Sequence, residues 1–184
     1  FETDAHQAQR AARLAKADLL TEMVDEFPEL QGVMGRYYAR EDGEAVAVAA
    51  ALDEIYQPRF AADAVAASPL GRLLAVAERA DTLVGIFAIG KAPTGAKDPF
   101  ALRRAAVGLL RSLIEGEHAI DLAALFQAAA AQQPAALAAA EQVEPLVEFC
   151  LERLRGVYQE AGYGAELFEA VRSVRAPGTL TPLD

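Results

Sequence analysis

The stretch that decides the fold is residues 68–115, SPLGRLLAVAERADTLVGIFAIGKAPTGAKDPFALRRAAVGLLRSLIE. It holds two long helical patterns separated by a polar interruption. Ser68-Pro69 begins the first pattern, because a hydroxyl can cap a helix and the missing N–H of proline costs nothing at the first helical position. Asp98-Pro99 repeats this arrangement with a carboxylate that also suits the helix dipole. The glycines and the proline of residues 90–97 predict a loop between the two helices.

The rest of the chain has the same helical character. Ala and Leu outnumber Val and Ile, and no alternating run of apolar and polar residues is bounded by hairpin turns. We therefore predict an all-α protein. The helical patterns cover residues 4–25, 28–41, 44–57, 68–89, 99–115, 121–132, 141–161 and 164–174.

A soft boundary is expected near residues 116–120, with a compact bundle before it and a helical extension after it. The last nine residues, APGTLTPLD, are typical of a linker, so residues 176–184 are predicted to be a tail.

Composition and charge exclude several classes of protein. The chain has 184 residues and a net charge of −10, and acidic or basic residues interrupt every apolar run, so no membrane span is expected. The first stretch mixes charges of both signs and does not resemble a signal peptide. The single cysteine, Cys150, allows no intrachain disulfide and is predicted to be a buried thiol, which fits a cytoplasmic protein.

Motifs for metal binding or nucleophilic catalysis are missing from the sequence. His6 and His118 are far apart, with no Cys or Asp at ligand spacing beside them, so we expect surface or capping roles and no metal site. No nucleophile elbow of the G-x-S-x-G type is present. The loop at residues 90–98 is not a P-loop, because Ala96, Lys97 and Asp98 follow the last glycine where a lysine and a hydroxyl residue would be required.

Three residues are singled out as structural. Asp81 shares a predicted helical stripe with Leu70, Leu74, Ala77 and Val84, so we predict a buried carboxylate paired with a basic side chain or with backbone N–H groups. A catalytic or metal-binding role is the alternative. Gly32 and Gly35 interrupt a helical pattern at a cost of about 1 kcal/mol each relative to alanine. Close approach of a neighbouring helix or backbone, with Tyr37 and Tyr38 packing at the end of the turn, would offset that cost, and ligand contact is the other possibility.

One segment is locally basic on this acidic chain. Residues 91–111 contain five cations and a single acid, Asp98. On a helix starting at Pro99, a rotation of about 100° per residue brings Arg104 and Arg111 within about 20° of each other. The segment predicts either contact with a phosphate backbone or a solvated face whose arginines pair with neighbouring acids. The candidate tRNA-binding residues are Lys91, Lys97, Arg103, Arg104 and Arg111.

Four strings closely resemble the β subunit of bacterial heterotetrameric glycyl-tRNA synthetase. They are LLTEMVDEFPELQGVMGRYYAREDGE (19–44), YQPRFAAD (56–63), AERADTLVGIFAIGKAPTGAKDPFALRRAAVGLLR (77–111) and FCLERLRGVYQEAGY (149–163). The resemblance implies an α2β2 ligase for tRNA(Gly), in which the α subunit binds glycine, ATP and Mg²⁺ and the β subunit contributes tRNA recognition. It also implies an HD-domain-like helical bundle over residues 1–116, and an extension over 117–175 that leads toward an anticodon-binding domain.

An active HD centre needs a His-Asp dyad, but residues 14–18 read Leu-Ala-Lys-Ala-Asp, and Glu78 stands where the family pattern has Asp. We therefore expect no catalytic residue, metal or cofactor within this chain and no activity of the chain alone. The expected role is noncatalytic tRNA contact and assembly. A purely structural protein–protein module and a residual phosphohydrolase using Asp18 and Asp81 are the alternatives.

Overall fold

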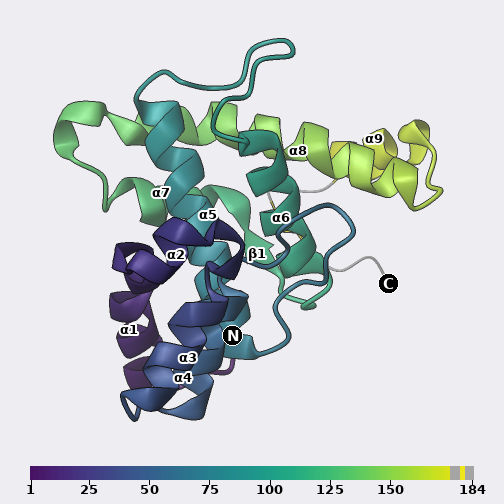
Figure 1. Ribbon diagram of the computed structural model, residues 1–184. Helices are drawn as coiled ribbons and strands as arrows, with labels where there is room; N and C mark the ends of the chain where they lie inside the picture. The colour runs from purple at the N-terminus through teal and green to yellow at the C-terminus, as the bar shows by residue number, and fades with distance from the viewer. Residues whose placement is uncertain (175–178, 181–184) are drawn as a thin grey trace. The chain divides into compact units, whose positions relative to one another are not determined.

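The computed structural model of the chain is described here for residues 1–174 and 179–180, and it is built almost entirely of helices (Figure 1). The all-α prediction is confirmed. The α-helices are α1 (Ala5–Leu14), α2 (Glu22–Glu26), α3 (Val33–Glu41), α4 (Val46–Glu54), α5 (Pro69–Ala88), α6 (Leu102–Ile114), α7 (Leu122–Ala130), α8 (Val143–Glu160) and α9 (Ala165–Val174). Short 3-10 helices are η1 (Ala17–Leu20), η2 (Pro28–Leu30), η3 (Ala135–Leu137) and η4 (Ala139–Gln142).

The described strands are two very short segments, β1 (Ile120–Asp121) and β2 (Thr179–Leu180). They pair antiparallel, with Ile120 opposite Leu180 and Asp121 opposite Thr179. The linker predicted for residues 176–184 lies outside the described residues apart from β2. No helix in the described part of the chain has the length and apolar composition that crossing a bilayer requires.

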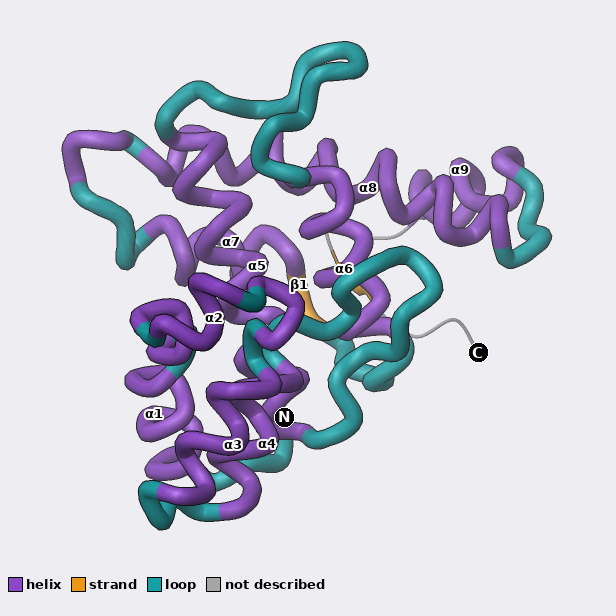
Figure 2. Tube along the Cα trace, in the orientation of Figure 1, coloured by secondary structure: helices purple, strands orange, loops and turns teal. Residues whose placement is uncertain are grey.

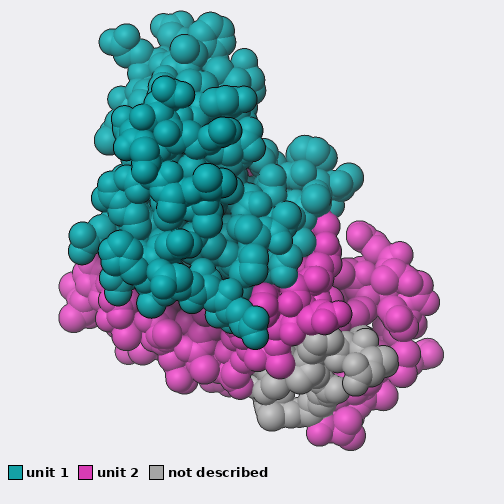
Figure 3. Space-filling view, turned by 90° about the horizontal axis from the view of Figure 1, so that it is seen from below, with its two compact units in different colours: residues 1–78 teal, residues 79–184 magenta. Residues whose placement is uncertain are grey.

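The chain forms two compact units, residues 1–78 and residues 79–184, coloured separately in Figure 3. The division falls within α5, not near residues 116–120. Compactness and family domain limits are different properties, so the assignment of residues 1–116 to an HD-like domain and of 117–175 to an extension stays a prediction.

In the first unit, the helix predicted over residues 4–25 is broken. Asp4 caps α1 by accepting a hydrogen bond from the N–H of Gln7 (2.8 Å). The helix ends at Leu14, and Lys16 adopts a left-handed conformation with φ +64°. Thr21 then caps the separate helix α2 through its hydroxyl oxygen. The break turns η1 inward and buries Asp18.

The core of the first unit lies where α4 packs against both α1 and α3. Small side chains on α4 allow this close packing, since Ala49 and Ala51 have no solvent exposure. The start of α5 closes the same core. Its buried apolar cluster contains Ala11, Val48, Ala51, Ile55, Leu70 and Leu74.

In the second unit, α8 is central and packs against α6, α7 and α9. Phe87 of α5 meets Phe149 of α8 edge to face, with ring centroids 5.3 Å apart. The fully buried side chains of this unit include Leu83, Leu102, Leu109, Leu110, Leu113, Leu122, Phe126 and Leu146.

The two predicted helix starts have different outcomes. Ser68 caps α5, because its Oγ accepts a hydrogen bond from the N–H of Gly71 (2.9 Å), and the helix begins at Pro69 as predicted. By contrast, α6 begins at Leu102 and not at Pro99. Asp98 still accepts hydrogen bonds from the first-turn N–H groups of Leu102 (2.8 Å) and Arg103 (3.0 Å), so its carboxylate caps the helix across an intervening turn.

Candidate functional site

Asp18 is the buried carboxylate in the part of the first unit where the resemblance places an HD centre. Only 5% of the residue is exposed, and its Oδ2 accepts a hydrogen bond from the N–H of Gly32 (2.6 Å). Gly32 is the N-cap of α3, so this carboxylate lies at the positive end of the helix dipole. A backbone donor and a helix terminus therefore stabilise the charge of Asp18 without a metal ion.

Gly32 and Gly35 make room for this arrangement. The sequence predicted Gly32 inside a helix, but it is the N-cap of α3, with φ +82°. A Cβ on Gly32 would lie 2.6 Å from Tyr56 Cδ2. Gly35 is inside α3, and a Cβ there would lie 3.3 Å from Cγ of Asp18. Both glycines are closely approached, but the nearest atoms belong to side chains, those of Tyr56 and Asp18, and not to the backbone of a neighbouring element. Tyr37 and Tyr38 are exposed on α3 (51% and 36%).

A partly buried ion cluster adjoins Gly32 and was not predicted from the sequence. Asp53, at the end of α4, is 8% exposed and pairs with Arg59 (2.6 Å) and Arg36 (3.2 Å). The Arg59 guanidinium lies 6.0 Å from the ring centroid of Tyr56. Burial raises the pKa of the Tyr56 hydroxyl, and the nearby Asp18 and Glu78 carboxylates act in the same direction. The sequence signal that could have located this cluster is an acid at the end of an apolar helical pattern, Asp53, followed by Arg59.

Glu78, which stands where the family pattern has Asp, pairs with Lys16, two positions before Asp18. Lys16 Nζ lies 2.7 Å from Glu78 Oε1. The donor set does not fit a divalent metal, because an ammonium neutralises Glu78 and a backbone N–H binds Asp18. Among the described residues no group of three or more His, Cys, Asp or Glu side chains is placed to hold a metal ion.

The prediction of a buried Asp81 is wrong. Asp81 is exposed, and its Oδ1 accepts a hydrogen bond from Gln133 Nε2 (2.7 Å). The buried charge on α5 is Arg79, which is 6% exposed and lies so near α6 that a Cβ on Gly108 would be 2.7 Å from its Nε. The prediction assumed that α5 buries a single stripe of its surface. The helix buries residues on more than one side, so a residue at helical spacing from Leu74 need not be buried.

Two of the five candidate tRNA-binding cations have partners within the chain. Arg103 donates from Nη2 to the carbonyl oxygen of Gly95 (2.5 Å) and lies 4.0 Å from Asp98 Oδ2, so it ties the loop to α6. Arg111 donates from Nε to Glu115 Oε1 (2.7 Å). These two arginines serve the structure of the segment, and the shared face of Arg104 and Arg111 is partly neutralised.

Three cations remain available to a ligand. Lys91, Lys97 and Arg104 are exposed, and none takes part in an ion pair or side-chain hydrogen bond with another described residue. Lys91 and Lys97 belong to the loop between α5 and α6, a long irregular segment in Figure 2 that runs out from the helices of the second unit. Arg104 follows in the first turn of α6.

The cysteine is buried, and the two histidines lie in different compact units. Cys150 is fully buried, as predicted, and burial raises the pKa of its thiol from 9.0 to about 12. The thiol is therefore un-ionised at neutral pH and a poor nucleophile. His6 is exposed on α1, while His118 belongs to the other compact unit, where its backbone N–H donates to the carbonyl of Leu113 (2.9 Å).

Comparison with known proteins agrees with the resemblance seen in the sequence. The model of the family described as "Glycyl-tRNA synthetase beta subunit" matches residues 2–173. The chain belongs to this family. The glycine–tRNA ligase beta subunits of Chromohalobacter salexigens and Aromatoleum aromaticum are each 54% identical to it, over 170 residues (92% of the chain) and 169 residues (91%). That of Xanthomonas campestris is 50% identical over an alignment of 187 positions, which covers 98% of the chain.

The chain spans about a quarter of the length of these relatives, because the matched regions cover 25%, 24% and 27% of the three proteins. Within the family, residues 1–184 therefore correspond to one part of the beta subunit. The matched residues 2–173 include Asp18, Lys16, Glu78 and the basic segment.

Proposed function

We propose that this chain acts as a noncatalytic, tRNA-contacting and assembly part of a glycine–tRNA ligase. The observation that carries the proposal is the group of exposed cations without partners, Lys91, Lys97 and Arg104, on a chain whose net charge is −10. Unpaired cations on a projecting loop and an adjoining helix turn are suited to a phosphate backbone. The family to which the chain belongs is the reason why we propose tRNA as this polyanion.

The local structure leaves these cations free of the nearest acid. The carboxylate of Asp98 accepts two backbone hydrogen bonds at the start of α6 and approaches Arg103. It is therefore occupied, and Lys91, Lys97 and Arg104 keep their positive charge for a partner. Contacts of this kind position an RNA and give little sequence preference, since they bind phosphate oxygens and no base edges.

The proposal assigns the chemistry of ligation to other parts of the enzyme. Asp18 binds a backbone N–H and Glu78 binds Lys16, so neither carboxylate is free for acid–base or metal chemistry. Glycine activation with ATP and Mg²⁺ would then belong to an α subunit, with which the chain would assemble in a cytoplasmic α2β2 enzyme for tRNA(Gly). The same observations leave no support for a residual phosphohydrolase.

The test is the salt dependence of tRNA binding by the intact synthetase. The variant Lys97→Gln/Arg104→Gln should lower the slope of log Kd against log salt concentration by about two units, or about one per lost phosphate contact. The matched control is Arg13→Gln/Arg40→Gln, which removes two exposed arginines of the other compact unit without a described ion-pair partner. The control should leave the slope unchanged.

Other outcomes would point elsewhere. Equal slopes for the variant and the wild type would contradict the tRNA contact. If the slope is unchanged while the α and β subunits separate, the basic segment serves a subunit interface, which is the alternative function considered from the sequence. Equal losses in the variant and in the control would show a general charge effect and would also contradict the specific site.

A further inference from the structure

The first unit exposes an apolar surface that the tRNA proposal does not use. The exposed residues lie on η1, on and just after α2, and on α3. Three of them, Met23, Phe27 and Tyr38, line a shallow hollow of about 550 Å³. Leu20 is 90% exposed, Phe27 50% and Met23 39%. We call this surface the α2 patch; its apolar residues are Leu19, Leu20, Met23, Phe27, Tyr37 and Tyr38.

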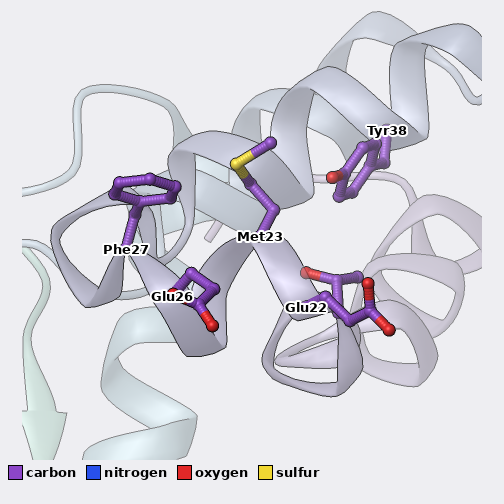
Figure 4. Close-up of a pocket in the computed structure, with 6 residues that line it drawn as sticks. Glu22, Met23, Glu26, Phe27 and Tyr38 are labelled. Carbon is purple, nitrogen blue, oxygen red and sulfur yellow. The ribbon is translucent and has the colours of Figure 1, made fainter.

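The apolar side chains that line the hollow come from α2, from the residue just after it and from α3. Figure 4 shows Met23 between Phe27 and Tyr38, with Glu22 and Glu26 beside them. Exposed apolar surface of this extent costs free energy in water, and aromatic residues with methionine are enriched where proteins bind each other. The patch therefore has the composition of an interface whose partner is missing.

The edge of the patch is acidic, which restricts what can bind. Glu22, Asp25, Glu26 and Glu29 are exposed, and residues 21–30 contain no lysine or arginine. None of these four carboxylates takes part in an ion pair with another described residue. Four unpaired carboxylates repel a phosphate backbone and attract cations, so the partner is a polypeptide and not RNA.

We infer that the α2 patch is an intrasubunit docking surface. Its occupant is a segment of the same β polypeptide outside residues 1–184, with an apolar face flanked by lysine or arginine. The inference rests on family membership, because the matched relatives have about three quarters of their length outside the matched region. Attachment through the same chain gives such a segment a high effective concentration, so it can bind a patch of modest size.

The experiment uses the full-length β subunit with the photoreactive residue p-benzoylphenylalanine in place of Phe27. Irradiation should give an intrachain crosslink to a peptide outside residues 1–184, identified by mass spectrometry, in the β subunit alone. A mixture of ¹⁵N-labelled and unlabelled subunits should show crosslinks within one copy only. The matched control places the same residue at Phe60, an exposed phenylalanine of the same unit outside the patch, and should give no such crosslink.

Charge reversal tests the acidic edge separately. Glu22→Lys/Glu26→Lys should reduce the crosslink yield from position 27 by about fivefold, because like charges then oppose each other at the rim of the interface. Glu41→Lys/Asp42→Lys changes two exposed acids at the end of α3, outside the acidic edge and not among the residues that line the hollow, and should leave the yield unchanged. If the position 27 variant fails to fold, the photoreactive residue at Tyr38 replaces it.

Each remaining outcome overturns the inference. The first is the absence of a crosslink from either patch position in a folded subunit. The second is a crosslink only to a second β copy, to the α subunit or to tRNA. The third is a crosslink only within residues 1–184. A crosslink to tRNA would reverse the argument from charge. None of these results depends on the salt slope of tRNA binding, so failure of the docking surface and failure of the proposed function are distinguishable.

Discussion

The surroundings of Asp18 and the basic segment at residues 91–111 treat charged side chains in opposite ways. Asp18 and Asp53 are buried and have partners, the N–H of Gly32 for Asp18 and the guanidinium groups of Arg36 and Arg59 for Asp53. In the basic segment, Lys91, Lys97 and Arg104 point into solvent without a described partner. A buried charge must be paired to persist, whereas an exposed charge is stable alone. Charges of the first kind hold the fold, and those of the second are available to a ligand.

The comparison also separates two aspartates that the sequence alone could not rank. Asp18 is buried and binds a backbone N–H, while Asp81 is exposed and binds the side chain of Gln133. Their contributions to stability should therefore differ, and the following predictions test that difference in order of decreasing effect.

Asp18→Ala should reduce the free energy of unfolding by about 3 kcal/mol, because it leaves the N–H of Gly32 without its acceptor and opens a cavity beside α3. Asp81→Ala should cost less than about 0.5 kcal/mol, as expected for an exposed site. Urea denaturation of both variants, followed by circular dichroism, gives the two values. Equal losses would mean that burial does not distinguish these carboxylates.

Gly32→Ala should cost about 2–3 kcal/mol, because the new Cβ meets the Tyr56 ring and the backbone is left-handed. Gly43→Ala is the matched control, since Gly43 has φ +80° but no atom within 4 Å of the added Cβ. It should cost only the conformational strain, about 1 kcal/mol. The difference between the two urea midpoints measures the close approach itself, and identical midpoints would show that Tyr56 moves aside freely.

Arg103→Ala should cost about 0.5–1 kcal/mol, because it removes the hydrogen bond to the Gly95 carbonyl and the nearby pairing with Asp98. Amide hydrogens at residues 91–98 should exchange faster in this variant. Arg104→Ala should leave both stability and exchange within error, because no described residue binds its guanidinium. Loss of protection in Arg104→Ala alone would reverse the assignment of these two arginines.

Much of the helical architecture was predictable from local signals. Ser68-Pro69 marked the start of α5, and the apolar periodicity located α7, α8 and α9 to within about two residues. The break after Leu14 was missed, because nothing in the local pattern marks Lys16 as left-handed. The start of α6 was placed three residues early, since a capping carboxylate can act across a turn as well as directly before the helix.

By itself, the sequence determined the all-α class, the family, the buried cysteine and the position of a basic segment, because helix caps, periodicity and family strings are properties of neighbouring residues. Only the tertiary structure decided which charges are buried. Asp18, Asp53 and Arg79 are buried while Asp81 is exposed, and Arg103 is bound while Arg104 is not. Burial and pairing depend on residues distant in the chain, such as Gly32 for Asp18 and Gly108 for Arg79, and no local pattern carries that information.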